Sequence, residues 1–285
     1  MSIGGMRASP PEGHEMQRSL ETLRQRPHLS VSALKMWLSC PRKFRLHYVD
    51  KAEPSHRAIS LVFGHAWHEL IGRVLLLHRK GHTLRRNELR DYFSAALERE
   101  ISADGPPVLF EDDEDAPMLI GTAMQMLEAF LATVPLPDNL IHVELPFSLE
   151  LADPETGEVL PMPLIGAIDA VMGDNQRLEL WELKSGKRRW AEDAVLYDFQ
   201  PTAYRMAIRA KAERASAQPE VHLKLIVTTK AKRPDVQVED LVRTMADERD
   251  LMETAASVHR AIMSGCLHAV RSWRCAGCEY SDVCR

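Results

Sequence analysis

Hydrophobic residues in the first half of the chain recur with the spacing of helices. One predicted helix face carries apolar residues at positions 119, 123, 126, 127, 130, 131 and 134. Pro41 interrupts or restarts an earlier segment of this kind, and Gly81 ends another. We therefore predict helices over residues 29–40, 59–81, 87–101 and 117–134.

Polar and apolar residues alternate in the next part of the chain, with the period of two that is typical of strands. Two turn-rich stretches, "ADPETGEV" and "GDN", separate the alternating segments. We therefore predict three consecutive strands, paired as a meander, over residues 140–151, 163–172 and 177–184. We predict that a helix, a strand and a long amphipathic helix follow, near residues 199–213, 221–229 and 238–264.

The composition is that of a soluble globular protein, with 45% hydrophobic and 27% charged residues. A length of 285 residues is near the upper limit for one hydrophobic core, so we predict a single domain over residues 29–285 after a flexible lead at 1–28. No apolar run approaches the roughly 18 residues of a membrane span, and no secretory signal opens the chain. The five cysteines, three of them packed at one end, argue against a secreted disulfide framework. We therefore expect a cytoplasmic, reduced protein without membrane contact.

The net charge of −5 excludes a global basic field, so any binding of nucleic acid must rely on local patches. Two stretches, residues 40–45 and 183–190, are dense in lysine and arginine. The opposite extreme is the acidic segment 110–117, which we interpret as a solvated linker.

Ionic residues end the predicted second and third strands on faces that are otherwise apolar. In the third strand, Glu182 and Lys184 continue a face that begins with two leucines, and Asp169 lies near the end of the second strand. A buried carboxylate or ammonium is costly unless it is paired or binds metal. Asp169 and Glu182 could hold one divalent cation through their oxygens, with Lys184 beside it. The alternative is a cross-strand ion pair of either carboxylate with Lys184.

The last eleven residues, "CAGCEYSDVCR", contain Cys275, Cys278 and Cys284. Two thiolates separated by two residues can point at one metal ion, but tetrahedral thiolate sites usually have four ligands. Cys266 and Cys40 compete for the fourth position. Four thiolates suit zinc as well as an iron–sulfur cluster.

The segments "GAIDAV" (166–171) and "LELWELKSGK" (178–187) resemble the Asp…Glu-x-Lys signature of the PD-(D/E)XK nuclease superfamily. Three further segments are similar to its RecB-like branch: residues 29–49 with Cys-Pro-x-x-Phe, 63–70 with Gly-x-x-x-His, and 200–204 with Gln-x-x-x-Tyr. The cysteine tail resembles that of the iron–sulfur subgroup, found in AddB-type helicase-nucleases and CRISPR adaptation nucleases. The resemblance covers nearly the whole predicted domain, in the family's order of motifs.

This resemblance implies a restriction-endonuclease-like α/β fold, with a mixed sheet in αβββαβ order. The catalytic core would lie within residues 140–230 and an added helical region within 59–134. A cluster-binding tail, residues 266–285, would complete the domain.

The same resemblance implies a 4Fe-4S cluster that joins the N- and C-terminal segments, with zinc as the less favoured alternative. The Cys-Pro context selects Cys40 over Cys266. The cluster ligands would be Cys40, Cys275, Cys278 and Cys284. Such a cluster would be mainly structural, so its ligand variants should lose folding before chemistry.

Carried over residue by residue, the resemblance assigns four metal ligands, namely His68, Asp169, Glu182 and the backbone carbonyl of Leu183. Lys184 would position the attacking water or stabilise the transition state, so it joins Asp169 and Glu182 in the expected catalytic set. The family prefers Mg²⁺ or Mn²⁺, and a histidine among carboxylates is compatible with Mn²⁺.

Four further residues would contact DNA. Gln200 and Tyr204, one helical turn apart, would line a DNA groove, although Pro201 places Gln200 at the start of its helix. Arg188 and Arg189 would contact phosphates, and a solvated charged turn is the alternative for this pair.

We therefore expect a metal-dependent DNA nuclease, acting as an exonuclease on duplex ends or single strands through a metal-activated water. Basic stretches and Trp190 would follow the DNA backbone. Its context would be DNA repair, recombination, or the processing of phage or CRISPR DNA. No helicase motor is encoded, so a helicase or recombination partner would supply any unwinding. The alternative from another class is a cluster-stapled DNA-binding or adaptor module of a larger nuclease complex, with little catalysis of its own.

Overall fold

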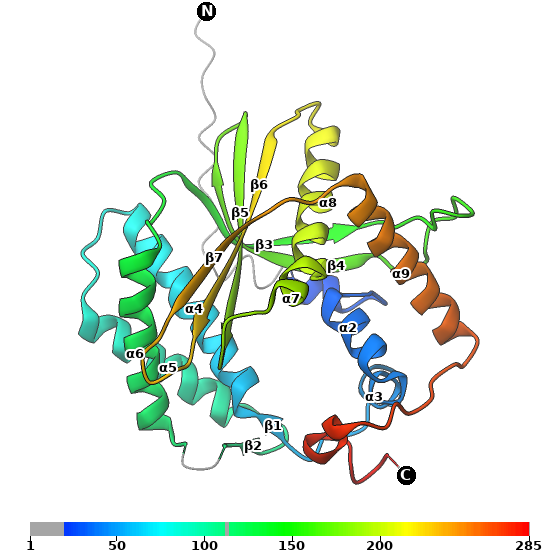
Figure 1. Cartoon of the computed structure of the whole chain (residues 1–285), viewed down its shortest axis with the longest axis horizontal. Coiled ribbons are helices and arrows are strands. Elements are labelled where there is room, and N and C mark those ends of the chain that lie inside the picture. Colours follow the sequence, from blue (N-terminus) through cyan, green and yellow to red (C-terminus); the bar gives the residue numbers. More distant parts are fainter. Residues whose placement is uncertain (1–19, 112–113, 285) are drawn as a thin grey trace, which may run out of the picture.

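A mixed five-stranded sheet forms the centre of the computed structural model (Figure 1). The structure describes residues 20–111 and 114–284. The strands stand in chain order across the sheet: β3 (Leu140–Leu149), β4 (Leu164–Gly173), β5 (Arg177–Gly186), β6 (Glu220–Thr229) and β7 (Val236–Leu241). The first three pair antiparallel, which confirms the predicted meander, and β6 then joins β5 in parallel. β7 completes the sheet antiparallel to β6.

Three long helices cover one face of the sheet. They are α4 (Ile59–Arg79), α5 (Arg86–Ser102) and α6 (Ala116–Thr133). Their bounds closely match the predicted ranges, because each helix carries a long apolar stripe. Trp67 of α4, Phe130 of α6 and Trp181 of β5 make edge-to-face ring contacts inside this buried cluster. Burying these rings removes a large apolar area from water and fixes α4 against the sheet.

The opposite face of the sheet is covered by α8 (Phe199–Arg214), against which α9 (Met245–Met263) and α2 (Val31–Ser39) pack. Neighbouring residues of β5 separate the two faces. Trp181 belongs to the cluster under α4 to α6, and Leu180 belongs to the cluster under α8. Because side chains alternate along a strand, residues two apart from Leu180 also point toward α8.

Paired charges fix α8 against α9. Glu248 of α9 is fully buried, and its carboxylate binds Arg205 and Arg209 of α8. Removing one partner of a buried ion pair costs about 3–5 kcal/mol, because the other charge is left uncompensated. The network therefore holds in place the helix that carries Gln200 and Tyr204.

One predicted helix is wrong in its first part. Residues 236–241 form β7, and α9 begins at Met245 rather than near residue 238. The alternation of Val236 and Val238 with polar residues has the period of a strand. The Thr244 side chain then accepts backbone N–H groups of the next turn in a capping box, which sets the start of the helix.

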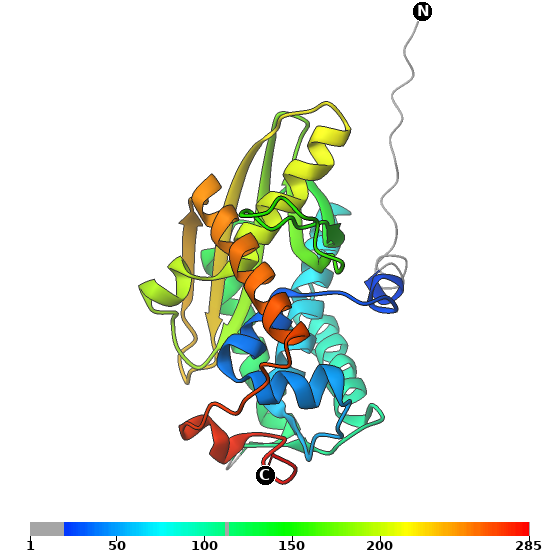
Figure 2. The ribbon, with the colours of Figure 1, turned by 90° about the vertical axis from the view of Figure 1, so that its right-hand side faces the viewer.

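The C-terminal segment lies beside the short helices that follow α2 (Figures 1 and 2). These are α3 (Pro41–Phe44) and a π-helical turn (Arg45–Val49), and a 3-10 helix (Trp273–Gly277) lies in the segment that contacts them. In the predicted lead, residues 20–24 are helical, and residues 1–19 lie outside the described part of the chain. Across the described residues, every helix is too short or too polar to span a bilayer.

Candidate active site

Strands β4 and β5 separate at the candidate site. Their pairing ends with Ala170 opposite Trp181, although both strands continue. Asp169 and Glu182, the next residues on each strand, stand at the opening of the fork that results. The Asp169 carboxylate bridges this fork, since its Oδ2 accepts a hydrogen bond from the Leu183 N–H at 2.6 Å. At this point the Asp169 side chain takes the place of the backbone hydrogen bonds between β4 and β5, and it is fixed between the two strands.

The backbone of Leu183 offers a second group to the fork. In an extended strand, the N–H and C=O of one residue point to the same side. Because the Leu183 N–H points at Asp169, its carbonyl also points to the side on which β4 has separated. The Asp169 carboxylate and the Leu183 carbonyl therefore face the same opening.

His68 reaches Asp169 from α4. Its Nδ1 lies 3.3 Å from Asp169 Oδ1, the oxygen that does not bind Leu183. Burial lowers the pKa of His68, but the Asp169 carboxylate outweighs this effect and raises that pKa above its usual value. His65, three residues earlier, lies 3.3 Å from Glu100. Of these two histidines, His68 faces the fork.

Glu182 and Lys184 share one face of β5, and their side chains form an ion pair. The Glu182 side chain is 2% exposed, and its Oε2 has no hydrogen-bond partner among the described residues. Burial raises the pKa of Glu182 to about 7, with Lys184 opposing the shift. Burial alone would lower the pKa of Lys184, but the Glu182 and Asp169 carboxylates raise it, so the lysine is a cation beside the fork.

Helix α8 presents Tyr204 to Glu182. Tyr204 is buried, and Gln200 Nε2 donates a hydrogen bond to its hydroxyl oxygen at 3.2 Å. Burial raises the pKa of Tyr204, and the nearby carboxylates raise it further, so the phenol stays protonated and can donate to Glu182. Gln200 lies in the first turn of α8, next to Pro201. The Gln200–Tyr204 pair therefore lies on the Glu182 side of the fork, with Tyr204 buried and Gln200 partly buried.

The two predicted phosphate contacts lie outside the fork. Arg188 and Arg189 are exposed in the turn after β5, and Arg189 Nε lies 3.5 Å from Asp235 Oδ2. Lys187, immediately before them, pairs with Glu111 of the acidic segment. Acidic neighbours thus partly neutralise this basic stretch, and the structure does not gather it with the buried residues of the fork.

The donor set of the fork fits a hard divalent cation. Carboxylate and carbonyl oxygens suit Mg²⁺ and Mn²⁺, and the His68 nitrogen suits Mn²⁺. The buried Oε2 of Glu182 supports this use, because Lys184 does not hold it and the nearby Tyr204 hydroxyl makes no hydrogen bond of normal geometry with it. Within residues 20–111 and 114–284, no three His, Cys, Asp or Glu side chains already stand in the arrangement of a metal site. Lys184 holds the other oxygen of Glu182.

No sequence motif points to Gln237, which fixes the segment after β5. The Trp190 N–H donates to Gln237 Oε1 at 2.8 Å, and Gln237 Nε2 donates to the Trp190 carbonyl at 3.2 Å. Lys184 Nζ lies 5.8 Å from the centre of the Trp190 ring. The period-two pattern of β7 was the available signal, because it assigns Gln237 to the sheet rather than to a helix.

A second candidate site, here called the clasp, consists of residues 266–284 packed on residues 39–55. Tyr280 is 1% exposed, and its hydroxyl lies 2.8 Å from His47 Nδ1. Three further residue pairs join the two segments: Arg42–His268, Lys43–Glu279 and Ser55–Glu279. The clasp therefore connects the end of the chain to the region around α3.

The clasp joins the segment that precedes Cys40 to the segment that precedes Cys275. Arg274, which precedes Cys275, donates a hydrogen bond at 3.2 Å to the side chain of Ser39, which precedes Cys40. This contact supports the choice of Cys40 as a partner of the tail.

The other tail cysteines differ in their surroundings. Cys278 is partly buried, burial raises the pKa of its thiol, and Cys284 is close enough to raise it further. Cys266 is exposed. Cys40 and the three tail cysteines supply the residue types of a four-thiolate metal centre, but among the described residues no three of these thiols stand in the arrangement of a metal site, and Cys266 is the natural control.

The family model of the PD-(D/E)XK nuclease superfamily matches residues 28–285. The chain belongs to this superfamily. The mixed five-stranded sheet, flanked by helices on both faces, is consistent with the restriction-endonuclease-like core of a PD-(D/E)XK nuclease.

The fold of this PD-(D/E)XK nuclease is also similar to a solved structure, that of a candidate exonuclease from Eubacterium rectale. The TM-score is 0.52 over 99% of this chain and 93% of that chain, with 13% sequence identity, and the likeness at this identity shows the fold alone. The structure of SSO0001 is 14% identical, with a TM-score of 0.34 over 88% of this chain and 94% of that chain, which carries no argument. No curated protein matches the sequence.

Proposed function

We propose that this PD-(D/E)XK nuclease is a metal-dependent DNA exonuclease that hydrolyses phosphodiester bonds at duplex ends or in single strands. The observation that carries the proposal is the fork, in which Asp169 is fixed between β4 and β5 beside His68 and the buried Glu182. The similar protein from Eubacterium rectale is itself a candidate exonuclease, which favours attack at ends.

The donor set supports Mg²⁺ or Mn²⁺ as the cofactor, held by His68, Asp169, Glu182 and the Leu183 carbonyl. When bound, such a cation lowers the pKa of a coordinated water and neutralises charge on the phosphate. Lys184 supplies the second positive charge. Its ammonium would turn from Glu182 toward the attacking water or a phosphate oxygen, where it opposes the negative charge that develops.

The remaining residues keep the two carboxylates in place. The Leu183 N–H holds one oxygen of Asp169 and leaves the other facing His68. Tyr204, which stays protonated, would orient Glu182 from α8 by donating its hydroxyl hydrogen to the carboxylate. Water rather than a side chain attacks phosphorus, so no covalent intermediate with the protein forms.

The substrate would be DNA, and contacts outside the fork would position it. Arg188 and Arg189 are exposed and suit phosphate binding. A helicase or recombination partner would supply open strands, in DNA repair, recombination, or the processing of phage or CRISPR DNA.

Hydrolysis assays with end-labelled DNA test this proposal. Linear single strands, circular single strands and duplexes are incubated with Mg²⁺, Mn²⁺ or EDTA, using wild type, Asp169→Asn and Lys184→Ala. We expect wild type to degrade linear strands with either cation, to spare circular strands, and to stop in EDTA. Equal degradation by wild type and both variants, or none by folded wild type, would show that the assignment is wrong. Degradation of the circular strands would show that the enzyme is an endonuclease rather than an exonuclease.

We further propose that Cys40, Cys275, Cys278 and Cys284 hold one 4Fe-4S cluster. The Arg274–Ser39 contact beside two of these cysteines supports it, and four thiolates suit such a cluster. A reducing cytoplasm would keep these thiols available. Anaerobically purified protein should be brown and contain iron and sulfide. A colourless protein with one zinc ion per chain would show that the four cysteines bind zinc instead of a cluster.

A further inference from the structure

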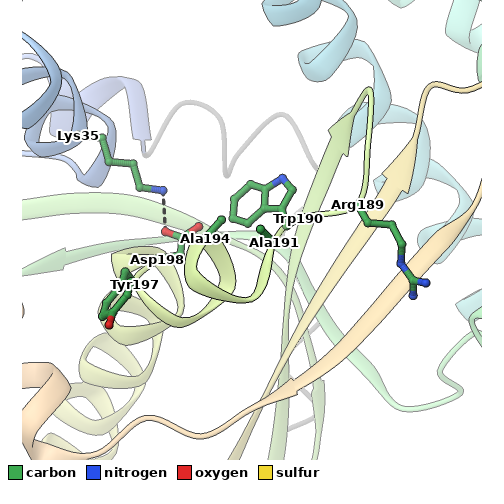
Figure 3. A pocket seen from close by; sticks show the side chains of 7 residues that line it. All are labelled: Lys35, Arg189, Trp190, Ala191, Ala194, Tyr197 and Asp198. Atoms are coloured by element: carbon green, nitrogen blue, oxygen red, sulfur yellow. Dashed lines mark hydrogen bonds and ion pairs between the residues drawn. The ribbon is translucent and has the colours of Figure 1, made fainter.

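An open surface pocket of about 470 Å³, here called the cavity, lies beside the fork (Figure 3). Its wall combines part of α2, the turn after β5, and the short helix α7 (Glu192–Leu196) with its junction to α8. The lining residues are Lys35, Arg189, Trp190, Ala191, Ala194, Tyr197 and Asp198. Trp190 links the cavity to the fork, because its ring centre lies 5.8 Å from Lys184 Nζ. A ligand in this cavity would lie next to the catalytic lysine.

The protein holds the Trp190 wall of the cavity in place through the main chain. Both backbone polar groups of Trp190 bind the side chain of Gln237, which is 6% exposed. These bonds use the backbone and leave the face of the indole ring for other contacts. A ring that is already positioned loses little conformational entropy when a ligand binds to it.

The side of the cavity formed by α7 and its junction with α8 is fixed as well. The guanidinium of Arg243, a buried residue, donates to the carbonyl of Val195 at 2.8 Å and to that of Asp198 at 3.4 Å, which braces the junction of α7 and α8. Tyr197 lies within this braced segment, and it is 73% exposed. Trp190 and Tyr197 are thus the two aromatic residues that line the cavity, and aromatic side chains are the surfaces on which unpaired bases stack.

The charges of the cavity suit a base better than a phosphate. Lys35 Nζ lies 2.6 Å from Asp198 Oδ1, and the two charges largely cancel. In Figure 3, Arg189 points away from the other labelled side chains, and its Nε lies 3.5 Å from Asp235. What remains is apolar wall, aromatic ring and one partly exposed ammonium. Such a surface matches a flat uncharged ring with hydrogen-bond acceptors at its edge.

We propose that this cavity binds a nucleobase of an unpaired DNA strand, next to the phosphate that the fork cleaves. The proposal rests on the nuclease function proposed above and defines its substrate as single-stranded DNA or a frayed end. Trp190 stacks on the base, and Lys35 donates to an acceptor at the base edge. A base can enter only when it has left the duplex, and the cavity volume lies within the range of small-ligand sites.

The test measures binding without cleavage, in EDTA and in an Asp169→Asn parent protein. A fluorescein-labelled single strand of roughly 12 nucleotides, within the usual site sizes, is compared with a series in which one base at a time is removed. We expect one abasic position to weaken binding to the parent about tenfold, as the loss of one stacked base does. Adding Trp190→Ala should weaken binding of the intact strand by a similar factor and abolish the response to that position, because both changes remove the same contact. Trp190→Phe should restore most of the affinity.

Trp273→Ala is the matched control, because this tryptophan is 83% exposed on the clasp and outside the cavity. It should bind like the parent. The proposal is overturned if no abasic position weakens binding to the parent, or if Trp190→Ala keeps the same positional response. It is also overturned if Trp190→Ala weakens binding of a blunt duplex as much as binding of the single strand. The abasic series in the parent requires no variant of Trp190 to fold. A failed hydrolysis assay would refute the proposed nuclease activity without changing these binding results.

Discussion

The fork and the clasp both join segments that are distant in sequence, but they are held by different forces. At the fork, Asp169 and Glu182 stand on inner strands whose two faces are covered by apolar clusters. At the clasp, Tyr280 alone is buried among residues 264–284, and the other contacts are partly exposed polar pairs. Each such pair contributes on the order of 1 kcal/mol or less.

The fold alone therefore positions the residues of the fork, whereas the clasp needs a further connection between its two segments. The sheet and its helices fix the carboxylates of the fork, so their substitution should affect chemistry far more than folding. The contacts of the clasp are weak one by one, and a metal centre shared by Cys40 and the tail would make them cooperative. Removing that centre should therefore affect folding first.

The largest effect is expected at the fork. Asp169→Asn keeps an oxygen that can accept the Leu183 N–H but removes the charge, so the rate of DNA hydrolysis should fall at least about 10²–10³-fold. The melting temperature should change little, since the side chain keeps its shape. Asp240→Asn is a matched control, because Asp240 is an exposed carboxylate on the edge strand β7. Initial rates and thermal unfolding followed by circular dichroism measure both quantities, and an unchanged rate in Asp169→Asn would remove Asp169 from the catalytic set.

The next largest effect is expected at the clasp. Cys278→Ser should remove the bound metal and lower the melting temperature by about 6–12 °C, the change that roughly 3 kcal/mol produces in a domain of this size. Nuclease activity per folded molecule should change less than in Asp169→Asn. Iron content, absorbance and thermal unfolding measure the effect. Cys266→Ser, at an exposed position, should behave like wild type. If both serine variants keep the metal and the melting temperature of wild type, the proposed cluster ligands are wrong.

Long, unmixed patterns explain why much of the fold was predictable from the sequence. Helices α4 to α6 and strands β3 to β5 each repeat one period over ten or more residues, so their existence was predicted correctly. The strand β7 was missed because its six residues lie directly before the polar first turn of α9. A short period-two pattern merges with a helical one unless the cap at Thr244 is recognised as a boundary.

The candidate site was predictable only where it depends on local spacing. Alternation along β5 places Glu182 and Lys184 on one face, and the structure has them paired there. The end of the β4–β5 pairing at Ala170 depends on the twist and register of the whole sheet, which no local pattern encodes. The hydrogen bond from Leu183 to Asp169 follows from that separation and was therefore out of reach.

A smaller effect is expected from the buried anchor of the clasp. Tyr280→Phe keeps the ring but removes the hydroxyl that lies 2.8 Å from His47 Nδ1, so unfolding should become easier by about 1 kcal/mol. Chemical denaturation of the metal-loaded protein measures it. In a double-mutant cycle with His47→Ala, the two losses should be less than additive, because they remove one contact. Full additivity would mean that the two side chains do not interact in solution.

The smallest effect is expected from Arg274. Comparing its substitution in wild type and in a Cys278→Ser protein tests whether a metal centre holds the clasp closed. Arg274→Ala removes a hydrogen bond to Ser39 between two exposed side chains. With the metal centre in place, opening of the tail is already limited, so hydrogen exchange in the tail should not change. In a Cys278→Ser background the tail is held by weak contacts alone, and the same substitution should speed exchange there about two- to fivefold, as a loss of up to 1 kcal/mol does. Equal acceleration in both backgrounds would mean that polar contacts, rather than a shared metal centre, hold the clasp closed.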